Sequence, residues 1–292
     1  MWGKINLYKP ENMTSQQAVS HLRRILGLKR IGHSGTLDPM ATGVLNCFVG
    51  RATRFIDLLP ESEKIYKADF ILGKSSDTLD IWGKVVDHEF EAVEEEELKR
   101  VLEGFLGESL QLPPMYSAIK YKGRALYDYA REGQEIERKK RRILISKLEL
   151  LNFDGFEGSL MIHCSRGTYV RSLIDDIGSR LGTAGLMSGL VRLRNDWVDL
   201  EDCYSLDQIR EMYSKGDMSF LTCPATNVSL ARADIDKTTY EDLAQGRINS
   251  FRSECQQGRY LIYWDNNFVG TALCEKEGFL VRERIIKVED DS

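Results

Sequence analysis

A glycine-bounded segment, residues 32–43, carries the acidic side chain that is best placed to do chemistry. It reads Gly-His-Ser-Gly-Thr-Leu-Asp-Pro-Met-Ala-Thr-Gly, and its glycines allow backbone conformations that other residues avoid. Pro39 restricts the residue before it to an extended conformation, which holds the side chain of Asp38 in a defined direction. A carboxylate held in this way is a candidate nucleophile or general base. The alternative is a turn-forming or helix-capping aspartate, which is the usual role of an Asp-Pro pair.

The other residue types that support chemistry are scattered along the chain. The six cysteines form no C-x-x-C pair, and the four histidines stand apart from one another. We therefore expect no metal site and no disulfide framework, but reduced, mostly buried thiols in a cytoplasmic protein. No apolar run approaches the ~20 residues of a membrane-spanning helix, and the N-terminus lacks the apolar stretch of a secretory signal.

Charge is unevenly distributed, although the whole chain carries only −5. Residues 1–56 contain eight basic and two acidic residues, and residues 116–147 contain ten basic and four acidic residues. Residues 85–110 are acidic, with two basic residues against nine acidic ones. Two basic regions beside an acidic one can form a face that binds a polyanion, or they can simply be solvated surface.

Hydrophobic periodicity places residues 32–43 among alternating helices and strands. Apolar stripes predict helices at Thr14–Leu28, around Leu98, Val101, Leu102 and Phe105, and from Val170 to Leu181. Strands are expected at Ile65–Leu72, Ile143–Leu151 and Leu160–Cys164, and the last two are joined by a turn at Asp154-Gly155. Because helices and strands interleave irregularly, we expect an α+β fold.

The C-terminal part has a different character. Ser214–Val228 loses periodicity, so we place a domain boundary near Pro224 and expect domains at residues 1–223 and 224–292. Short strand signals separated by turns follow, and they indicate a small β-rich domain. They lie at Tyr260–Trp264, Phe268–Cys274 and Phe279–Val281.

Residues 32–45, GHSGTLDPMATGVL, resemble the catalytic motif of the TruB family of tRNA pseudouridine synthases. Other segments resemble further motifs of that family, in the family's order, over roughly residues 4–195. They are Lys9-Pro10 with Met13-Thr14-Ser15, Lys64–Ala68, Pro113–Ala118 through Ala130-Arg131, and Ser165–Leu173. One departure is Asn12, where the opening motif commonly has glycine; asparagine tolerates a positive φ better than most residues.

The resemblance implies that the protein isomerises a uridine in the T arm of tRNA, at position 55, to pseudouridine without a metal, nucleotide or organic cofactor. It makes Asp38 the catalytic aspartate and Arg171 the cation that pairs with it and keeps it ionised. From the residues alone, an exposed pair of Arg171 with Asp175, four positions along a helix, remains an alternative.

Four further residues receive roles from the same resemblance. Tyr66 is expected to stack on the target base and to assist proton transfer, and Tyr169 and Leu190 are expected to line the uridine pocket. An enzyme that acts on a stacked base must extrude it, and His33 is expected to occupy the space left behind.

The resemblance also implies a mixed, mainly antiparallel central sheet flanked by helices, followed by a PUA or PUA-like RNA-binding domain. An insertion at about residues 113–142 is expected to fold over the RNA stem-loop and to contact phosphates. Its candidate contacts are Lys120, Lys122, Arg124, Arg138, Lys139, Lys140, Arg141 and Arg142.

We expect a monomer whose partner is tRNA and which has no membrane association. Two other functions stay open on the residues alone. The first is a tRNA-binding folding chaperone that works without turnover. The second is a sugar hydrolase, which would need a second acid beside Asp38.

Overall fold

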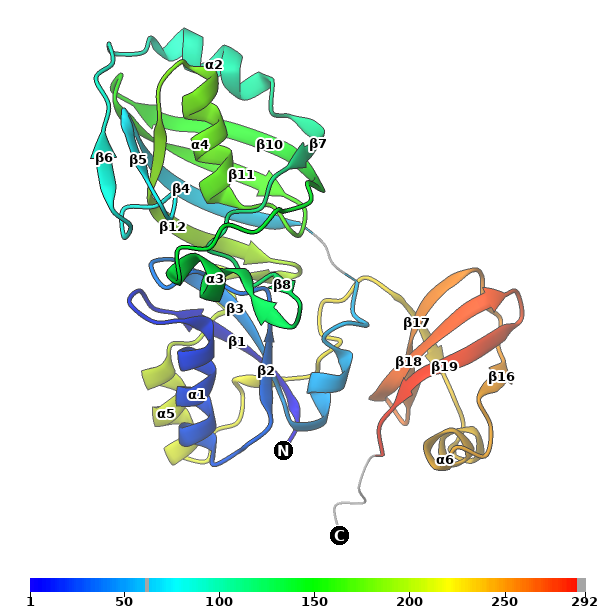
Figure 1. Cartoon of the computed structure of the whole chain (residues 1–292). Helices are drawn as coiled ribbons and strands as arrows, with labels where there is room; N and C mark the ends of the chain where they lie inside the picture. The colour runs from blue at the N-terminus through cyan, green and yellow to red at the C-terminus, as the bar shows by residue number, and fades with distance from the viewer. Residues whose placement is uncertain (61–62, 288–292) are drawn as a thin grey trace.

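The computed structural model describes residues 1–60 and 63–287. A large sheet forms the body of the molecule, and a smaller C-terminal sheet lies to one side of it (Figure 1). The strands of the large sheet are β1 (Gly3–Lys9), β2 (Ile31–Ser34), β3 (Thr42–Val49), β4 (Lys64–Leu72), β7 (Gly107–Gln111), β10 (Arg141–Phe153), β11 (Glu157–Cys164), β12 (Gly185–Asn195), β13 (Val198–Asp199) and β14 (Leu221–Thr222).

The large sheet is mixed and mainly antiparallel. Its strand order is β14-β1-β3-β12-β4-β11-β10-β7, with β2 added to β3 and β13 added to β12. The pair β12–β3 is parallel, with Val191 opposite Thr42, and every other pair of strands in this sheet of the described residues is antiparallel. The expected α+β fold with a mixed central sheet is confirmed.

Helices α1 (Ser15–Leu26), α2 (Glu95–Glu103), α4 (Val170–Arg180) and α5 (Leu206–Ser214) accompany this sheet (Figure 1). Helix α1 begins one residue after the expected start, because Thr14 caps it: the Thr14 hydroxyl accepts from the Gln17 backbone N–H, and the Gln17 side chain accepts from the Thr14 N–H in return. It ends at Gly27, whose φ of 65° suits the left-handed conformation of a helix C-terminus. Helix α2 ends before Phe105, which is nevertheless buried just beyond it.

One apolar core joins the sheet to the segment that carries Asp38. Strand β4 alternates as predicted, with Tyr66, Ala68, Phe70 and Leu72 on its buried face. This face packs with the apolar stripe of α4, which includes Leu173 and Ile177, and with Leu37, Met40 and Ala41. Three residues around Asp38 are therefore anchored in the core, so the position of its carboxylate is set by packing.

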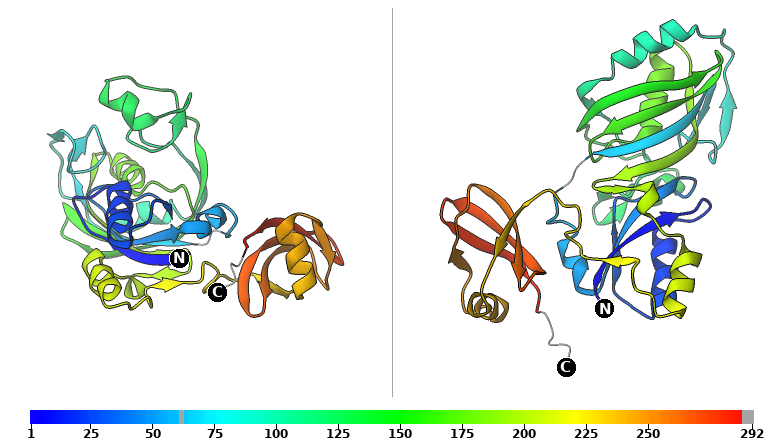
Figure 2. Two further views of the ribbon diagram at one scale, coloured as in Figure 1. Left: turned by 90° about the horizontal axis from the view of Figure 1, so that it is seen from below. Right: turned by 180° about the vertical axis from the view of Figure 1, so that it is seen from behind.

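Smaller elements connect these parts. A hairpin of β5 (Lys74–Ser76) and β6 (Val85–Asp87) follows β4, and short 3₁₀ helices η1 (Gly50–Phe55) and η2 (Leu200–Asp202) follow β3 and β13. The segment expected to contact RNA contains β8 (Lys120–Tyr121), β9 (Arg124–Ala125) and α3 (Leu126–Arg131). Figure 2 shows this segment projecting away from the large sheet.

The C-terminal sheet has the strand order β15-β17-β18-β19-β16. Its elements are β15 (Ala231–Asp234), α6 (Lys237–Gln245), β16 (Ser250–Arg252), β17 (Gly258–Trp264), β18 (Asn267–Lys276) and β19 (Phe279–Ile285). The three strands expected from sequence are confirmed as β17, β18 and β19, whereas β15, β16 and α6 were not expected.

The two sheets are joined through an apolar contact. Phe55 from η1 packs edge-on against Phe268 from β18, with ring centroids 5.0 Å apart, in a cluster that also contains Leu261 and Ile286. The chain leaves the large sheet at β14, ending at Thr222, and enters the small one at Ala231. The domain boundary at Pro224 stays a prediction. In the described part of the chain, no helix has both the length and the apolar character needed to cross a membrane.

Candidate active site

A cavity of about 540 Å³ opens beside the Asp38 segment, where β3, β12 and the beginning of α4 meet. This volume lies within the usual range for small-molecule sites. Eight of the predicted site residues line it, namely Asp38, Arg171, Tyr66, His33, Tyr169, Leu190, Lys120 and Arg141. The other six candidates for RNA contact, Lys122, Arg124, Arg138, Lys139, Lys140 and Arg142, lie outside the lining of this cavity.

The segment around Asp38 is held by buried polar contacts. The Leu37 N–H donates to Ser15 Oγ over 2.9 Å, and that hydroxyl donates to the Leu37 carbonyl over 3.0 Å. The Ala41 N–H closes a turn on the Asp38 carbonyl at 3.1 Å. Met40 and Ala41, which follow the turn, are packed in the core. The backbone on both sides of Asp38 is therefore held in place.

Lys9 stabilises this turn through hydrogen bonds to backbone carbonyls. Its fully buried Nζ donates to the carbonyls of Met13 at 2.6 Å, Pro10 at 2.8 Å and Pro39 at 3.3 Å. Burial lowers the pKa of Lys9 to about 8, although the charge of Asp38 works in the opposite direction. In the sequence Lys9 belongs to the opening motif, and no local signal marks it as a functional residue.

Asp38 and Arg171, far apart in sequence, form a two-point ion pair. Arg171 Nε lies 2.9 Å from Oδ2 of Asp38, and Nη2 donates to Oδ1 over 3.0 Å. The Arg171 side chain is only 5% exposed, whereas that of Asp38 is 33% exposed and faces the cavity. Within the described residues no ion pair joins Arg171 to Asp175, so the alternative pairing along the helix is wrong.

Backbone carbonyls hold the Arg171 guanidinium in place. Nη1 donates to the Thr78 carbonyl at 2.8 Å, and Nη2 donates to the Tyr116 carbonyl at 2.9 Å. A guanidinium fixed on several sides presents its fork to Asp38 in one orientation. Tyr116 belongs to the insertion expected to contact RNA, so that insertion is tied directly to the ion pair.

A second buried carboxylate, missed from sequence, approaches Arg171. Asp80 Oδ2 lies 3.7 Å from Nη1, and Oδ1 of Asp80 accepts from the Thr78 hydroxyl at 2.8 Å and from the Trp82 N–H at 3.1 Å. Asp80 lies outside the cavity lining, so it does not supply the second substrate-facing acid that a sugar hydrolase would need. No local sequence signal marks Asp80, because its partner comes from another element.

These neighbours set the charge of Asp38. Burial raises the pKa of Asp38 above its ordinary value, and the Arg171 guanidinium opposes that shift by its charge and its hydrogen bonds. The Asp80 charge raises the pKa of Asp38 further, and the Lys9 charge lowers it. Arg171 is therefore the main group that favours the ionised form.

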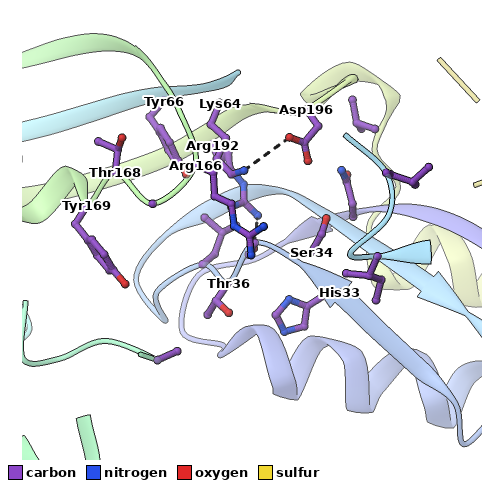
Figure 3. Close-up of a pocket in the computed structure, with 18 of the residues that line it drawn as sticks. His33, Ser34, Thr36, Lys64, Tyr66, Arg166, Thr168, Tyr169, Arg192 and Asp196 are labelled. Carbon is purple, nitrogen blue, oxygen red and sulfur yellow. Dashed lines mark hydrogen bonds and ion pairs between the residues drawn. The ribbon is translucent and has the colours of Figure 1, made fainter. Parts of the chain in front are cut away.

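The remaining predicted pocket residues come from β2, β4, β12 and the start of α4. Tyr66 and Leu190 are 7% and 8% exposed, so both present part of a mainly buried side chain to the cavity. Tyr169 precedes α4, and its backbone is fixed by Gln111, which accepts from the Tyr169 N–H at 2.8 Å and donates to its carbonyl at 3.0 Å. His33 lies across the cavity from Tyr66 and Tyr169 (Figure 3).

Four cationic side chains that were not predicted as site residues also line the cavity, namely Lys4, Lys64, Arg166 and Arg192. Lys64, Arg166 and Arg192 lie between the tyrosines and the strand bearing His33 (Figure 3), and Lys64 Nζ is 3.8 Å from Asp196. Arg192 is almost fully buried at 1% exposure. The available sequence signal is the single charge of Arg192 within the apolar run Leu190–Leu193.

Some of the basic residues expected to contact RNA bind other residues of the insertion, and others face the cavity. Arg124 is paired with Glu132 and stacks on Tyr129, and Arg138 donates to the Pro113 carbonyl at 3.0 Å and to Glu135 at 3.0 Å. These two arginines help to fold the insertion itself. Lys120 and Arg141 face the cavity instead.

Comparisons with known proteins decide the family. A model described as TruB family pseudouridylate synthase (N terminal domain) matches residues 23–170. A tRNA pseudouridine synthase B from Latilactobacillus sakei subsp. sakei (strain 23K) is 38% identical over 274 residues, which cover 90% of this chain and 90% of that protein. The enzyme of the same name from Streptococcus pneumoniae serotype 2 (strain D39 / NCTC 7466) is also 38% identical and covers 97% of this chain and 99% of its own length.

The chain belongs to the TruB family. Solved structures agree with this at the level of the fold. A Cbf5-Nop10-Gar1 complex contains a chain that matches this TruB family member with a TM-score of 0.72 and 25% identity, covering 98% of this chain and 84% of the other. An H/ACA RNP bound to a substrate RNA containing 2′-deoxyuridine gives a TM-score of 0.73 at 23% identity, covering 99% and 86%.

Proposed function

We propose that this protein isomerises a uridine in the T arm of tRNA to pseudouridine, with Asp38 as the reacting carboxylate. The family and the names of its relatives support an enzyme that forms pseudouridine in tRNA. The observation that carries the assignment of the site is the Asp38–Arg171 ion pair at the cavity, with Tyr66, Tyr169 and Leu190 lining the same space.

The pair fits a reaction that needs an ionised carboxylate. In the isomerisation the C1′–N1 bond breaks, a C1′–C5 bond forms, C5 loses its proton and N1 gains one. Whether Asp38 attacks the base or the sugar, or removes a sugar proton, it must carry a negative charge to act. Burial alone disfavours that charge, and the Arg171 fork restores it without blocking the cavity side of the carboxylate.

The cavity suits a base that has left the RNA stack. A uridine within a folded T loop is stacked, so its C5 and C1′ are inaccessible until the nucleotide is extruded. We assign His33 to the gap left in the loop and the two tyrosines to contacts with the extruded base. Burial and the Arg192 charge lower the pKa of His33, so a neutral imidazole ring is available for this contact.

The RNA-binding surface is assigned to the cavity rim and the insertion. Lys120 and Arg141 line the cavity from the insertion side, where a phosphate next to the extruded nucleotide would lie. We assign residues 1–223 to the catalytic domain and residues 224–292 to a PUA-like RNA-binding domain. A separate apolar cluster, including Leu243, Ile262 and Leu280, supports the second domain.

We also propose that the protein acts as a monomer in the cytoplasm. The six cysteines are free, and four of them are buried, which suits a reducing compartment.

The function is tested with purified protein and an unmodified tRNA transcript, followed by mapping of pseudouridine. The wild type should modify one uridine of the T arm. Asp38→Asn should form no product yet bind tRNA with a Kd within about tenfold of the wild type, because the phosphate contacts are unchanged. Asp175→Asn is the matched control on α4 and should remain active.

Two outcomes contradict the proposal. Product formation by Asp38→Asn removes that residue from its role. A wild type that binds tRNA without modifying it supports the chaperone alternative instead.

A further inference from the structure

Gln111 is a buried polar side chain whose amide binds the backbone of one cavity residue. It is the last residue of β7, it is only 5% exposed, and it lies outside the cavity lining. Its Oε1 accepts from the Tyr169 N–H at 2.8 Å, and its Nε2 donates to the Tyr169 carbonyl at 3.0 Å. One side-chain amide therefore holds both hydrogen-bonding groups of a single residue, as a neighbouring strand would.

Tyr169 needs this support because it stands at the start of α4. The N–H groups at the beginning of a helix have no partner within the helix. Tyr169 is extended, with φ −100° and ψ 109°, and in the described structure its own side chain forms no capping hydrogen bond. Its carbonyl accepts from the Leu173 N–H at 3.0 Å, which begins the helix. The Gln111 amide adds the contacts that fix the peptide groups on both sides of the Tyr169 Cα.

The segment that leads into Tyr169 is held at its other end by β10. The Ser165 N–H donates to the Leu144 carbonyl at 2.9 Å, and the Leu144 N–H donates to Ser165 Oγ at 2.9 Å. Between the two attachments, residues 166–168 line the cavity. Residues 165–169 thus form a part of the cavity wall that is fastened to β10 at one end and, through Gln111, to β7 at the other.

These contacts determine where the Tyr169 ring enters the cavity. The ring lines the cavity on the same side as Tyr66 (Figure 3). The Cα–Cβ bond of a residue takes its direction from the backbone, so fixing both peptide groups of Tyr169 also fixes the origin of its side chain. Small errors in such a position are costly, since a displacement of about 1 Å can slow a reaction by about 10²-fold.

We propose that Gln111 is a positioning residue for the isomerisation, and that its amide sets the Tyr169 ring against the extruded uridine. The inference rests on the proposed function, in which Tyr169 contacts that base. Gln111 acts through the Tyr169 backbone and does not itself touch the substrate. The rest of the first turn of α4 has other attachments, since Ser172 Oγ donates to the Leu112 carbonyl at 3.3 Å. Loss of the Gln111 amide should therefore disturb Tyr169 most.

A double-mutant cycle tests the coupling between the two residues. Single-turnover rates of pseudouridine formation are measured for the wild type, Gln111→Met, Tyr169→Leu and the double variant. Gln111→Met keeps the length of the side chain without the amide and should slow the reaction by about tenfold or more. In the Tyr169→Leu background the same change should slow it by less than about threefold. Equal slowing in both backgrounds overturns the proposal.

Gln208→Met is the matched control for loss of stability. Gln208 Oε1 accepts from the Ser205 N–H at 2.8 Å at the start of α5, so this variant also loses a bond from a glutamine side chain to the backbone. Gln208 lies outside the cavity lining, and its substitution should change the rate by less than about twofold. Slowing equal to that of Gln111→Met would attribute both effects to stability and overturn the proposal. The Kd for tRNA should stay within about threefold in every variant, because the phosphate contacts remain.

The pH–rate profile separates Tyr169 from Arg171 as the residue through which Gln111 acts. Gln111→Met should leave the acid limb unchanged, because Arg171 keeps its bonds to Asp38 and to the carbonyls of Thr78 and Tyr116. A shift of the acid limb to higher pH would show that Gln111 acts through Arg171, and it would overturn the assignment to Tyr169.

A spectroscopic measurement covers the case in which Tyr169→Leu shows no turnover. Tyr169→3-fluorotyrosine is observed by fluorine NMR, and Gln111→Met should shift or broaden its resonance, whereas Gln208→Met should not. A resonance unmoved by Gln111→Met excludes the proposal. If Gln111→Met does not fold, Gln111→Glu replaces it in every measurement with the same expected results, because it keeps the acceptor for the Tyr169 N–H and loses the donor to the carbonyl. Failure of the proposed function is distinguished by a wild type that forms no pseudouridine, and the fluorine spectra then still decide whether Gln111 positions Tyr169.

Discussion

The Asp80 carboxylate lies 3.7 Å from Nη1 of Arg171, while Asp38 is bound through Nε and Nη2 of the same guanidinium. The buried Arg171 thus lies between two carboxylates: Asp38 faces the cavity, and Asp80 lies in the segment between β5 and β6. Arg171 lowers the pKa of Asp38 and Asp80 raises it, so the two neighbours have opposite electrostatic effects on one carboxylate. Substitutions of Arg171 and of Asp80 should therefore shift the pKa of Asp38 in opposite directions.

Arg171→Lys should move the acid limb of the pH–rate profile to higher pH. Lysine keeps a charge but loses the two-point fork, so the pKa of Asp38 rises and the ionised form is lost at a higher pH. Single-turnover rates measured from pH 4.5 to about 8 would show the shift. Arg180→Lys on the same helix is the control, because Arg180 donates to the Gly104 carbonyl away from the cavity. Coincident acid limbs for wild type and Arg171→Lys would contradict this account.

Asp80→Asn should move the acid limb the other way, to lower pH, because a negative charge that raises the pKa of Asp38 is removed. The amide can still accept from Trp82 and Thr78, so the local fold should persist. We expect the rate at neutral pH to fall by roughly tenfold, since Arg171 loses one of the groups that hold it. A shift to higher pH would show that loss of Arg171 positioning outweighs the charge effect.

Lys9→Met should change how stability depends on pH. The folded pKa of Lys9 is about 8 and the unfolded value is about 10.4, so between these values only the unfolded chain holds the proton. The protonated lysine therefore costs stability below pH 8, and this cost is relieved as the pH rises toward 10.

The measurement is the difference in Tm between wild type and Lys9→Met at pH 7.5 and at pH 9.5. The wild type should gain on the variant at the higher pH, by an amount equivalent to ~2 kcal/mol. Lys4 and Lys64 also have lowered pKa values, but they titrate in both proteins and cancel in the comparison. A constant difference in Tm would show that Lys9 is not destabilised by burial.

Arg141→Gln and Arg142→Gln should differ, although the two residues are adjacent. Arg141 lines the cavity, and successive side chains of a strand point to opposite faces, so Arg142 projects from the other face of β10. Arg141→Gln should weaken tRNA binding and reduce the slope of log K against log salt by about 0.7–0.9, as expected for one lost phosphate contact. Arg142→Gln should leave the slope unchanged. Equal slopes for the two variants would remove Arg141 from the RNA interface.

Local sequence patterns were sufficient for the elements that frame the site. The helix expected at Thr14–Leu28, the strand expected at Ile65–Leu72 and the apolar stripe expected from Val170 each depend on residues close together in the chain, and the structure confirms them as α1, β4 and α4. Asn12 has the positive φ, 60°, that its residue type tolerates. The glycines and Pro39 around Asp38 made it only a candidate beside the turn-forming alternative, and its catalytic role was expected from the resemblance to the TruB family.

Local residue patterns did not decide what surrounds Asp38: its pairing with Arg171 was expected only from the resemblance to the TruB family, and the tertiary structure forms it. Arg171 is 133 positions away in the chain, and nothing in its own helix distinguishes an exposed pair with Asp175 from the buried one that forms. Asp80, Lys9 and Arg192 were missed for a common reason. Each is a charged residue in a strand or turn, and each is buried only because an element distant in the sequence packs over it. Hydrophobic periodicity over a few residues does not show this burial. The direction of Arg141 also depended on where β10 begins, which pairing with β7 determines. Local sequence patterns determine which side chains of a helix or strand face the core. The pairing and register of strands that are distant in the sequence determine which of these side chains come into contact.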